Sequence, residues 1–325
     1  MSIEKKPLVN DLYTADPSAH VFNGKIYIYP SHDEDIDVEN NDNGDQYDMK
    51  DYHVYEMPDT ETYPRDCGCV LKLEDIPWAS KQLWAPDCVE KDGKYYFVFP
   101  ARDKEGFFRI GIATSDKPEG PFKAEPNYIP GSYSIDPCMF PDTDGKYYLT
   151  FGGIWGGQLD QYRNNKWSAD NKEPKGDEEA CTAKIALMKD NLLEMAEEPK
   201  DIMILDENGK PLTGGDEARR YFEDPWMFKK GDTYYFTYST GTTHLLCYAT
   251  SKSVYGPFTY GGVILTPVLG WTTHHSILEY NGKWYLFYHD CERSGGVNQK
   301  RNVKFRELKF NDDGSIQTMD GSLDK

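Results

Sequence analysis

Asp92-Gly93-Lys94-Tyr95-Tyr96-Phe97-Val98-Phe99 is a short phrase in which a glycine-containing turn leads into a run of aromatic and β-branched residues. Asp-Gly favours the positive-φ conformations of tight hairpin turns, and aromatic and β-branched residues favour strands. The phrase therefore predicts the loop and second strand of a β-hairpin. Similar phrases occur at four other places in the 325 residues, at 23–29, 144–150, 230–236 and 281–288.

The recurrence of this phrase predicts a ring of similar β-units. Its glycines stand at 24, 93, 145, 231 and 282, so each unit has about 65 residues, somewhat more than the four-stranded blade of a simple propeller repeat. A second phrase repeats with identical spacing and is expected in the outer part of two blades: Ala113-Thr114-Ser115 with Gly120-Pro121-Phe122, and Ala249-Thr250-Ser251 with Gly256-Pro257-Phe258. A barrel of alternating strands and helices is excluded, because the hairpins leave no room for a helix after every strand.

Helical signal is scarce along the chain. The best stretch, 182–198, fits either a helix or a strand followed by a turn, and no linker rich in Pro, Gly or Ser divides the sequence. We therefore predict an all-β fold, a five-bladed β-propeller that forms a single domain over residues 1–325. The acidic stretch 33–51 is expected to be a long polar loop on the surface.

The chain is strongly acidic, with 36 Lys and Arg against 55 Asp and Glu and a net charge of −19. A surface of this sign repels nucleic acid, which excludes that class of partner. No run of about 18 apolar residues is present to span a membrane, and residues 1–7 contain no apolar core of a signal peptide. With an odd number of cysteines, seven, these features lead us to expect a cytoplasmic protein with reduced thiols.

Equivalent positions of the five predicted blades should converge near the axis, because the innermost strand of each blade lines the central channel. The equivalent position lies eight residues before each glycine, and nine residues before it in the third unit, whose turn is expected to be one residue longer. The Asp-Pro pairs at 16–17 and 136–137 then match, which supports this register. The positions reached in this way are Asp16, Ala85, Asp136, Glu223 and His274.

Three of these five positions hold carboxyl groups, for which structure alone gives little reason. Carboxylates that face one channel repel each other, which should raise the pKa of at least one of them. A protonated carboxylic acid near an ionised carboxylate is the arrangement that glycoside hydrolysis needs, one group protonating the leaving oxygen and the other activating water or attacking the sugar. A single Asp-Pro is also common in turns, so the inference depends on the shared register. Strand alternation lets only one of His274 and His275 face the channel. If His275 is the inward one, His274 is a hydrogen-bonded core residue instead.

These residues lie in a set of motifs that resembles glycoside hydrolase family 43 over nearly the whole chain: Ala15-Asp16-Pro17, Trp84-Ala85-Pro86-Asp87, Ser134-Ile135-Asp136-Pro137, Phe222-Glu223-Asp224-Pro225 and His274-His275-Ser276. The resemblance implies a five-bladed propeller with inverting β-xylosidase, α-L-arabinofuranosidase or arabinanase activity. It implies that Asp16 is the general base, Glu223 the general acid and Asp136 the carboxylate that tunes the pKa of the acid and orients it. It also implies that His274 lies beside a divalent metal in the channel, expected to be Ca²⁺ and bound through water. Asp224 stands where many members have a small residue, which leaves open which acid is used.

Eight further residues are candidates for substrate binding. Trp84, beside the small Ala85, would offer an apolar stacking face for a pentose, and a core tryptophan is the alternative. Trp155 lies in a glycine-rich loop and is expected at the pocket rim. Arg301 resembles an arginine that contacts the substrate or the base in the family, with a surface ion pair as the alternative. The remaining four follow strands that are expected to approach the pocket: His32, Asp33, Thr240 and His244.

The predicted function is the removal of terminal pentose units from xylan-derived oligosaccharides, most simply by an exo-acting β-xylosidase. An α-L-arabinofuranosidase or arabinanase with the same three carboxylates is the alternative within this class. A non-catalytic propeller that binds sugar or protein is the alternative from another class. The expected partner is a small oligosaccharide rather than nucleic acid or a membrane, and a homo-oligomer is expected if a second subunit completes one wall of the pocket.

Overall fold

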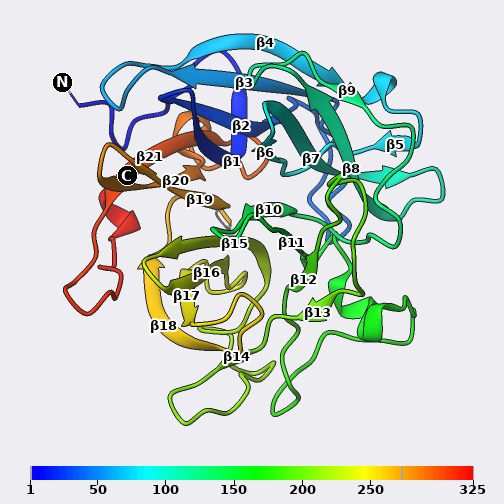
Figure 1. Cartoon of the computed structure of the whole chain (residues 1–325), viewed down its shortest axis with the longest axis vertical. Helices are drawn as coiled ribbons and strands as arrows, with labels where there is room; N and C mark the ends of the chain where they lie inside the picture. Colours follow the sequence, from blue (N-terminus) through cyan, green and yellow to red (C-terminus); the bar gives the residue numbers. More distant parts are fainter. Residues whose placement is uncertain (1, 272–273, 325) are drawn as a thin grey trace.

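Five β-sheets are arranged around a common centre, as the repeat predicts, so the fold is a five-bladed β-propeller (Figure 1). The structure is a computed structural model and describes residues 2–271 and 274–324. The blades follow one another in chain order around the ring, and both termini lie on the side of the fifth blade (Figure 1).

The first two blades come from residues 13–124. Blade 1 is a four-stranded sheet of β1 (Tyr13–Phe22), β2 (Lys25–Asp33), β3 (Asp51–Met57) and β4 (Arg65–Lys72). Blade 2 is a five-stranded sheet of β5 (Ala79–Lys81), β6 (Asp87–Lys91), β7 (Lys94–Asp103), β8 (Phe108–Ser115) and β9 (Lys123–Ala124). Both β5 and β6 pair with β7, so the first strand of this blade is split in two.

The other three blades complete the ring. Blade 3 consists of β10 (Cys138–Pro141), β11 (Tyr147–Phe151), β12 (Lys184–Leu187) and β13 (Lys200–Asp201). Blade 4 consists of β14 (Ile204–Leu205), β15 (Glu223–Lys230), β16 (Thr233–Ser239), β17 (Leu246–Ser251) and β18 (Phe258–Leu265). Blade 5 consists of β19 (His275–Tyr280), β20 (Lys283–Asp290) and β21 (Asn302–Leu308).

The first hairpin uses the predicted turn in blades 1, 2 and 5, whereas blades 3 and 4 differ. In blades 1, 2 and 5 the turn is Asn-Gly or Asp-Gly with positive φ at both residues, for example 52° at Asn23 and 76° at Gly24, as a type I′ turn requires. In blade 4, Lys230 pairs with Thr233, so Gly231, with φ 59°, takes the first turn position, as in a type II′ turn. The blade 4 glycine therefore stands one residue earlier in its turn than the glycines of blades 1, 2 and 5.

The N-terminal segment closes the ring. The backbone N–H groups of Lys5 and Leu8 donate to the carbonyls of Phe305 and Val303 on β21, at 3.0 and 2.9 Å. These bonds place the segment before β1 beside the last strand of blade 5. The N-terminal segment thus covers the outer edge of β21 and joins blade 5 to blade 1.

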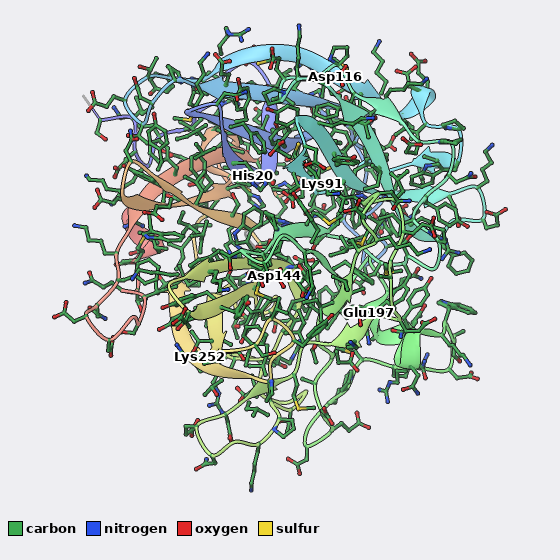
Figure 2. All side chains as sticks on the ribbon, viewed as in Figure 1. His20, Lys91, Asp116, Asp144, Glu197 and Lys252 are labelled. Atoms are coloured by element: carbon green, nitrogen blue, oxygen red, sulfur yellow. The ribbon has the colours of Figure 1, made fainter. Side chains whose placement is uncertain are left out.

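Apolar side chains from neighbouring blades form the core. Between blades 5 and 1, for example, Leu8, Ile28, Phe287 and Phe305 belong to one buried cluster. The second strands of the hairpins are buried at consecutive positions, for example on β7, β16 and β20, because a strand covered on both faces of its sheet buries residues of either alternation. The aromatic runs of the hairpins are therefore mostly inside. Figure 2 shows side chains filling the space between the blades, with His20 near the centre of the ring and Asp116 at its outer edge.

Residues 182–198 form a strand followed by a turn, which decides between the two interpretations of that stretch. The segment contains β12, and Met188 and Met195 then form an isolated bridge. The repeated Gly-Pro-Phe phrases lead into the outer strands β9 and β18, as expected. The helices of the described residues are all short 3₁₀ turns: η1 (Leu73–Asp75), η2 (Leu159–Gln161), η3 (Arg163–Asn165), η4 (Glu292–Ser294) and η5 (Gly321–Asp324). Each of these described helices falls short of the length and apolar character that a membrane span demands.

Candidate active site

Three Asp-Pro pairs interrupt or precede the innermost strands and direct side chains toward the axis. Asp16, Asp136 and Asp224 have φ of 51°, 56° and 63°, in the left-handed region that aspartate tolerates better than most residues. In blades 1 and 4 the pair sits in a β-bulge, between Ala15 and Ser18 and between Glu223 and Trp226. Such bulges re-aim side chains and are common next to active sites.

The register that led to Glu223 is one residue off in blade 4. Measured from the hairpin, the equivalent of Asp16 is Asp224, because both stand six residues before the last strand residue of the first hairpin strand, Phe22 or Lys230. Alignment on the glycine reached Glu223 because Gly231 occupies the first position of its turn rather than the second. In blade 3 the backbone N–H of Asp142 donates to the carbonyl of Lys146 over 2.8 Å, so the hairpin contact extends one residue beyond β10. The position six residues before Asp142 is Asp136, which the allowance for a longer turn also reaches.

A cavity of about 310 Å³ lies where the five blades meet. Such a volume is within the range of small-ligand pockets. All five predicted channel residues line it, and so do Trp84, Trp155 and Arg301. The complete lining is Asp16, Asn40, Asn41, Asp42, Gly44, Gln46, Tyr47, Met49, Trp84, Ala85, Ile135, Asp136, Trp155, Phe222, Glu223, Trp271, His274, His289, Asn298 and Arg301.

Arg301 holds Asp16 in place. Its Nη1 donates to Asp16 Oδ1 over 3.0 Å, while Nε and Nη2 donate to Asp33 over 2.8 and 2.7 Å. Ser31 Oγ donates to the other oxygen of Asp16. Burial alone would raise the pKa of Asp16, but the positive charge of Arg301 leads the opposing contributions, and the pKa is lowered to about 2. Asp16 is therefore an ionised carboxylate at neutral pH, and Arg301 is not a surface ion pair.

Glu223 and Asp136 are held in the opposite state. Burial and then the charge of Asp16 raise the pKa of Glu223 to about 8, so this group is mostly protonated at neutral pH. Burial and then the charge of Glu223 raise the pKa of Asp136 well above its usual range. Asp136 Oδ2 also accepts a hydrogen bond of 3.1 Å from the backbone N–H of Asp224, which fixes the peptide that joins Asp224 to Glu223.

The two adjacent histidines and Asp224 divide into a pocket residue and buried supports. His274 lines the pocket, with Nδ1 3.8 Å from Asp16 Oδ1 and 4.0 Å from Asp136 Oδ2. His275 is buried and bonds through Nε2 to Thr237 Oγ1 at 2.6 Å, while its backbone N–H donates to Asp224 Oδ2 over 2.8 Å. His274 is thus the channel histidine. Asp224 contacts both histidines and, among the described residues, is not part of the lining.

Two tryptophans form an aromatic edge of the pocket. Trp155 is 38% exposed and stacks on Trp271, with ring centroids 5.5 Å apart and an interplanar angle of 28°. Trp155 Nε1 donates to Glu173 Oε2 over 3.2 Å, which anchors the ring. Trp155 therefore lies at the rim, as predicted, and Trp271 extends the same apolar surface.

Trp84 borders the pocket but is largely enclosed. The ring is so close to Gly44 and Gly156 that a Cβ atom on either glycine would lie 2.4 or 2.6 Å from it. Its Nε1 donates to the carbonyl of Tyr47 over 2.8 Å. The polarity of the loop 33–51 predicts a surface position, but this holds only in part. The second half of the loop packs on Trp84 and lines the pocket.

Four predicted substrate-binding residues lie outside the lining formed by the described residues, so those assignments are corrected. His32 is directed to Asp51, with Nδ1 2.6 Å from Oδ1, and Asp33 is buried against Arg301. Thr240 is fully buried and accepts a 3.1 Å hydrogen bond from the backbone N–H of Leu245, closing the turn after β16.

His244 is the fourth of these residues, and it supports the pocket from behind. Its ring meets Trp271 edge to face, with centroids 5.4 Å apart at 87°. The physical reason for all four errors is the same: the end of a strand approaches the pocket, but alternation and the following turn direct the side chain elsewhere.

Several pocket residues were missed by the sequence reasoning. Trp271 is a large aromatic residue shortly before the channel histidine, which is a usable signal. His289 is the last but one residue of β20 and lines the pocket, and its Nδ1 accepts a 3.0 Å hydrogen bond from the backbone N–H of Asp16. The loop residues from Asn40 to Met49 carry no such signal, because their role depends on how the loop folds over Trp84.

The arrangement places an ionised carboxylate, Asp16, and a protonated carboxylic acid, Glu223, on one small pocket with an aromatic edge. Environments that push the pKa values of two carboxyl groups apart are the usual basis for separate base and acid roles. Removal of water from such a site strengthens both electrostatic effects. The geometry can therefore support acid–base cleavage of a bond to a small ring that stacks on the tryptophans.

Comparisons with known proteins agree with this chemistry. The sequence profile of Glycosyl hydrolases family 43 matches residues 5–316. A protein from Bacteroides ovatus named xylosidase/arabinosidase is 57% identical over 322 residues, which cover 99% of each chain.

Solved structures are similarly close. The RS223 β-xylosidase is 57% identical, with a TM-score of 0.96 and 98% of each chain covered. CoXyl43, described as a GH43 β-xylosidase/α-arabinofuranosidase from a compost microbial metagenome, is 55% identical with a TM-score of 0.96, covering 99% of this chain and 98% of the other. Its structure is a complex with xylotriose in a calcium-free form.

Proposed function

The chain belongs to glycosyl hydrolases family 43, as its motifs predicted, and we propose that it is an inverting, exo-acting β-xylosidase that releases terminal xylose from xylo-oligosaccharides. The observation that carries the proposal is the opposed pKa values of Asp16, about 2, and Glu223, about 8, on one pocket. The names of the relatives, β-xylosidase and xylosidase/arabinosidase, support the choice of pentose. An additional activity on α-L-arabinofuranosides is supported by the second half of the latter name.

Each carboxyl group has a separate proposed role. Asp16, held ionised by Arg301, accepts a proton from the attacking water as general base. Glu223, held protonated, donates a proton to the leaving glycosidic oxygen as general acid. Asp136 positions the acid, because it holds the backbone beside Glu223 through the N–H of Asp224.

The rest of the pocket is proposed to recognise the sugar. The Trp155–Trp271 edge offers stacking surface to the leaving part of the oligosaccharide, because the apolar faces of sugar rings pack on aromatic rings. The small Ala85 leaves space for the terminal xylose, and Trp84 gives that space a firm wall. Arg301 lies within the lining, so the substrate can contact its guanidinium as well as the base that it holds.

Ca²⁺ is the metal proposed for the channel, with His274 as its nearest protein group through water. The donor chemistry fits a hard cation, because Asp16, Asp136 and Asp224 surround the histidine and Ca²⁺ prefers oxygen ligands. Asp224 Oδ1 is buried, lies 2.8 Å from His274 Nε2 and makes no hydrogen bond within the described residues. A bound cation would supply positive charge that offsets the repulsion among these carboxylates. A chelator should therefore lower the melting temperature, and added Ca²⁺ should restore it.

A hydrolase panel with stereochemical analysis tests the function. Xylobiose and xylotriose are incubated with the protein, and ¹H NMR follows the first anomer released. Inversion predicts that α-xylose appears before mutarotation. Glu223→Gln should abolish turnover of xylobiose while it still binds the sugar, and Asp16→Asn should be equally inactive. Absence of xylose release by the wild type, or β-xylose as the first product, would refute the proposal.

A leaving-group comparison separates acid from base. A 2,4-dinitrophenyl xyloside needs little protonation on departure, so Glu223→Gln should recover much of its rate on that substrate, while Asp16→Asn should recover none. Equal recovery by both variants would contradict the assigned roles. Rates on 4-nitrophenyl α-L-arabinofuranoside measured in parallel show how far the second activity extends.

A further inference from the structure

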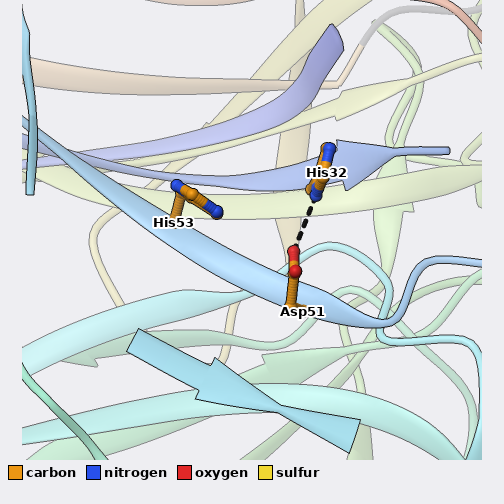
Figure 3. Close-up of side chains that lie close together, drawn as sticks. All are labelled: His32, Asp51 and His53. Atoms are coloured by element: carbon orange, nitrogen blue, oxygen red, sulfur yellow. Dashed lines mark hydrogen bonds and ion pairs between the residues drawn. The ribbon is translucent and has the colours of Figure 1, made fainter. Parts of the chain in front are cut away.

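Blade 1 brings together two histidines and an aspartate that take no part in the pocket. His32 lies near the end of β2, and Asp51 and His53 lie on β3. Because residues two apart on a strand face the same side, Asp51 and His53 share a face. Figure 3 shows the ring of His53 directed toward the His32–Asp51 pair. One potential ligand atom of each residue lies within 4.8 Å of those of the other two.

Asp66 on β4 prepares His53 for a ligand role. Its carboxylate oxygens lie 3.0 and 3.2 Å from His53 Nδ1, so Nδ1 carries the proton and Nε2 presents its lone pair. A carboxylate on the second ring nitrogen is the usual outer partner of a metal-bound histidine, because it fixes the tautomer and raises the basicity of the ligand. This contact is independent of the His32–Asp51 pair.

We propose that His32, Asp51 and His53 form a binding site for a divalent transition-metal ion, such as Zn²⁺. Two imidazoles and one carboxylate suit Zn²⁺ and its neighbours, whereas Ca²⁺ and Mg²⁺ prefer oxygen ligands alone. In a tetrahedral zinc site the ligand atoms are about 3.4 Å apart. The 2.6 Å contact between His32 Nδ1 and Asp51 Oδ1 therefore opens by less than about 1 Å as the ion replaces the shared proton.

The cluster is accessible enough to be loaded. The side chains of His32, Asp51 and His53 are 15%, 25% and 17% exposed, so an ion reaches them without unfolding of the blade. Three protein ligands leave a fourth position for water. The ligand set of this cluster, two imidazoles and one carboxylate, also differs from that of the channel, where carboxylates surround His274.

The position of the cluster determines what a bound ion does. His32 and Asp51 flank the segment 33–50, whose second half lines the pocket and packs on Trp84. An ion between them fastens both ends of this loop, which lowers the entropy cost of closing it. His32 also precedes Asp33, the partner of Arg301, so the same ion steadies the strand end that holds the base. The site thus links metal binding on blade 1 to the order of the pocket wall.

Calorimetric titration with ZnCl₂ tests the site without any substrate, so its outcome does not depend on the proposed hydrolase activity. Untagged protein is stripped with a chelator, and CaCl₂ is kept in excess to occupy the channel. We expect one Zn²⁺ per chain with a Kd in the micromolar range or below, and proton release detected by comparing two buffers. His53→Gln should weaken binding by at least about 100-fold, and Asp66→Asn by about 10–100-fold.

Matched variants guard against misfolding and non-specific binding. His32→Gln is a second, independent ligand deletion, and circular dichroism verifies the fold of each variant. His244→Gln removes a histidine outside the cluster and should leave the Zn²⁺ affinity unchanged. Equal affinity in wild type, His53→Gln and His32→Gln, or the absence of saturable binding to the wild type, would overturn the site.

Two cysteines are the rival ligands. Cys67 and Cys69 lie on β4, and Cys69 pairs with His53 across the sheet. The double variant Cys67→Ser/Cys69→Ser should keep the full Zn²⁺ affinity, and loss of binding there with retention in His53→Gln would overturn the proposal. Hydrogen exchange of residues 34–50 should slow on addition of Zn²⁺ to the wild type but not to His53→Gln. Unchanged exchange in Zn²⁺-loaded wild type would refute the fastening of the loop.

Discussion

Arg301 Nη1 donates a 3.0 Å hydrogen bond to Asp16 Oδ1. The arginine comes from the segment before β21 of blade 5 and the aspartate from β1 of blade 1, so the bond crosses the junction at which the ring closes. The other side of the guanidinium grips Asp33 through Nε and Nη2. A bidentate guanidinium fixes direction as well as charge, which makes this contact both the electrostatic support of the base and its mechanical anchor.

Replacing Arg301 should change the pH dependence of kcat/KM on the acid side. In Arg301→Gln the burial of Asp16 is no longer opposed by the guanidinium, so the pKa of Asp16 rises and an ascending limb of kcat/KM appears at acid pH. Arg301 also lowers the pKa of Glu223, so the descending limb should move upward too. We expect kcat/KM at neutral pH to fall by about 10²–10⁴, the range of a displaced general base.

Two further arginine variants separate charge from stability. Arg301→Lys keeps the positive charge but loses the bidentate geometry of the guanidinium. It should therefore lose activity, whereas the acid limb of its kcat/KM profile should shift little. Arg109 offers a matched ion pair outside the pocket lining, because its Nε donates a 2.8 Å hydrogen bond to buried Asp103. Arg109→Gln should lower the stability without moving either limb of the pH profile. An Arg301→Gln profile that superposes on that of the wild type would contradict the role of the guanidinium.

The wild-type pH profile should be dominated by its alkaline limb. Glu223 must be protonated to act as the acid, and its pKa is raised to about 8, so kcat/KM should fall as pH rises through that value. Asp16 stays ionised down to about 2, so no catalytic loss is expected from it at mildly acid pH. A calcium-buffered series of kcat/KM measurements on xylobiose checks this. A descending limb in the ordinary carboxyl range would show that Glu223 is not the acid.

The same raised pKa has a consequence for stability. Between the unperturbed value of 4.5 and about 8, the folded protein holds a proton on Glu223 that the unfolded chain has lost. The free energy of unfolding contributed by this group therefore decreases as pH rises through that window and is constant above it. Glu223→Gln removes this dependence, so its melting temperature relative to wild type should increase from acid to alkaline pH. A difference that does not change with pH would contradict the raised pKa.

The strands and the Asp-Pro positions could be predicted because each depends on local chemistry. Asn-Gly turns and aromatic runs specify hairpins, and the Asp-Pro pairs at 16–17 and 136–137 mark the positions where a left-handed aspartate turns its side chain inward. The glycine alignment that leads to Glu223 is one residue off, because Gly231 occupies the first position of a type II′ turn, whereas the other aligned glycines of two-residue turns occupy the second position of a type I′ turn. Glu223 lines the pocket because it immediately precedes the bulge, where the hairpin equivalent, Asp224, turns toward the histidines.

The predictions that failed all concern where a side chain or a loop points in the folded structure. Strand ends near His32 and Thr240 do approach the pocket, but which way their side chains point depends on alternation and on partners from other elements, such as Asp51. The loop 33–51 has the composition of a surface segment, and only its packing on Trp84 brings it into the site. Such contacts between segments far apart in the chain have no local signature.

Asp136 should act by position rather than by charge. Its pKa is raised well above the usual range by burial and then by Glu223, and Oδ2 accepts from the N–H of Asp224. Asp136→Asn keeps an acceptor oxygen of the same shape, whereas Asp136→Ala leaves that N–H without a partner. We expect Asp136→Ala to lose about 10²–10³ in kcat and Asp136→Asn to retain at least about tenfold more activity. Equal losses, with the alkaline limb displaced in both variants, would indicate that the charge of Asp136 is what matters.

The packing of Gly44 on Trp84 can be tested against a glycine of the same conformation. Gly44 and Gly24 have φ of 75° and 76°, but a Cβ on Gly44 would lie 2.4 Å from the Trp84 ring, whereas nothing lies within 4 Å of one on Gly24. Both alanine variants pay the same cost of about 1 kcal/mol or more for a positive φ, so their difference isolates the contact. Gly44→Ala should displace the loop from the tryptophan, raise KM for xylobiose several-fold and lower the melting temperature by a few degrees more than Gly24→Ala. Indistinguishable KM values for the two variants would show that the loop contributes nothing to substrate binding through this contact.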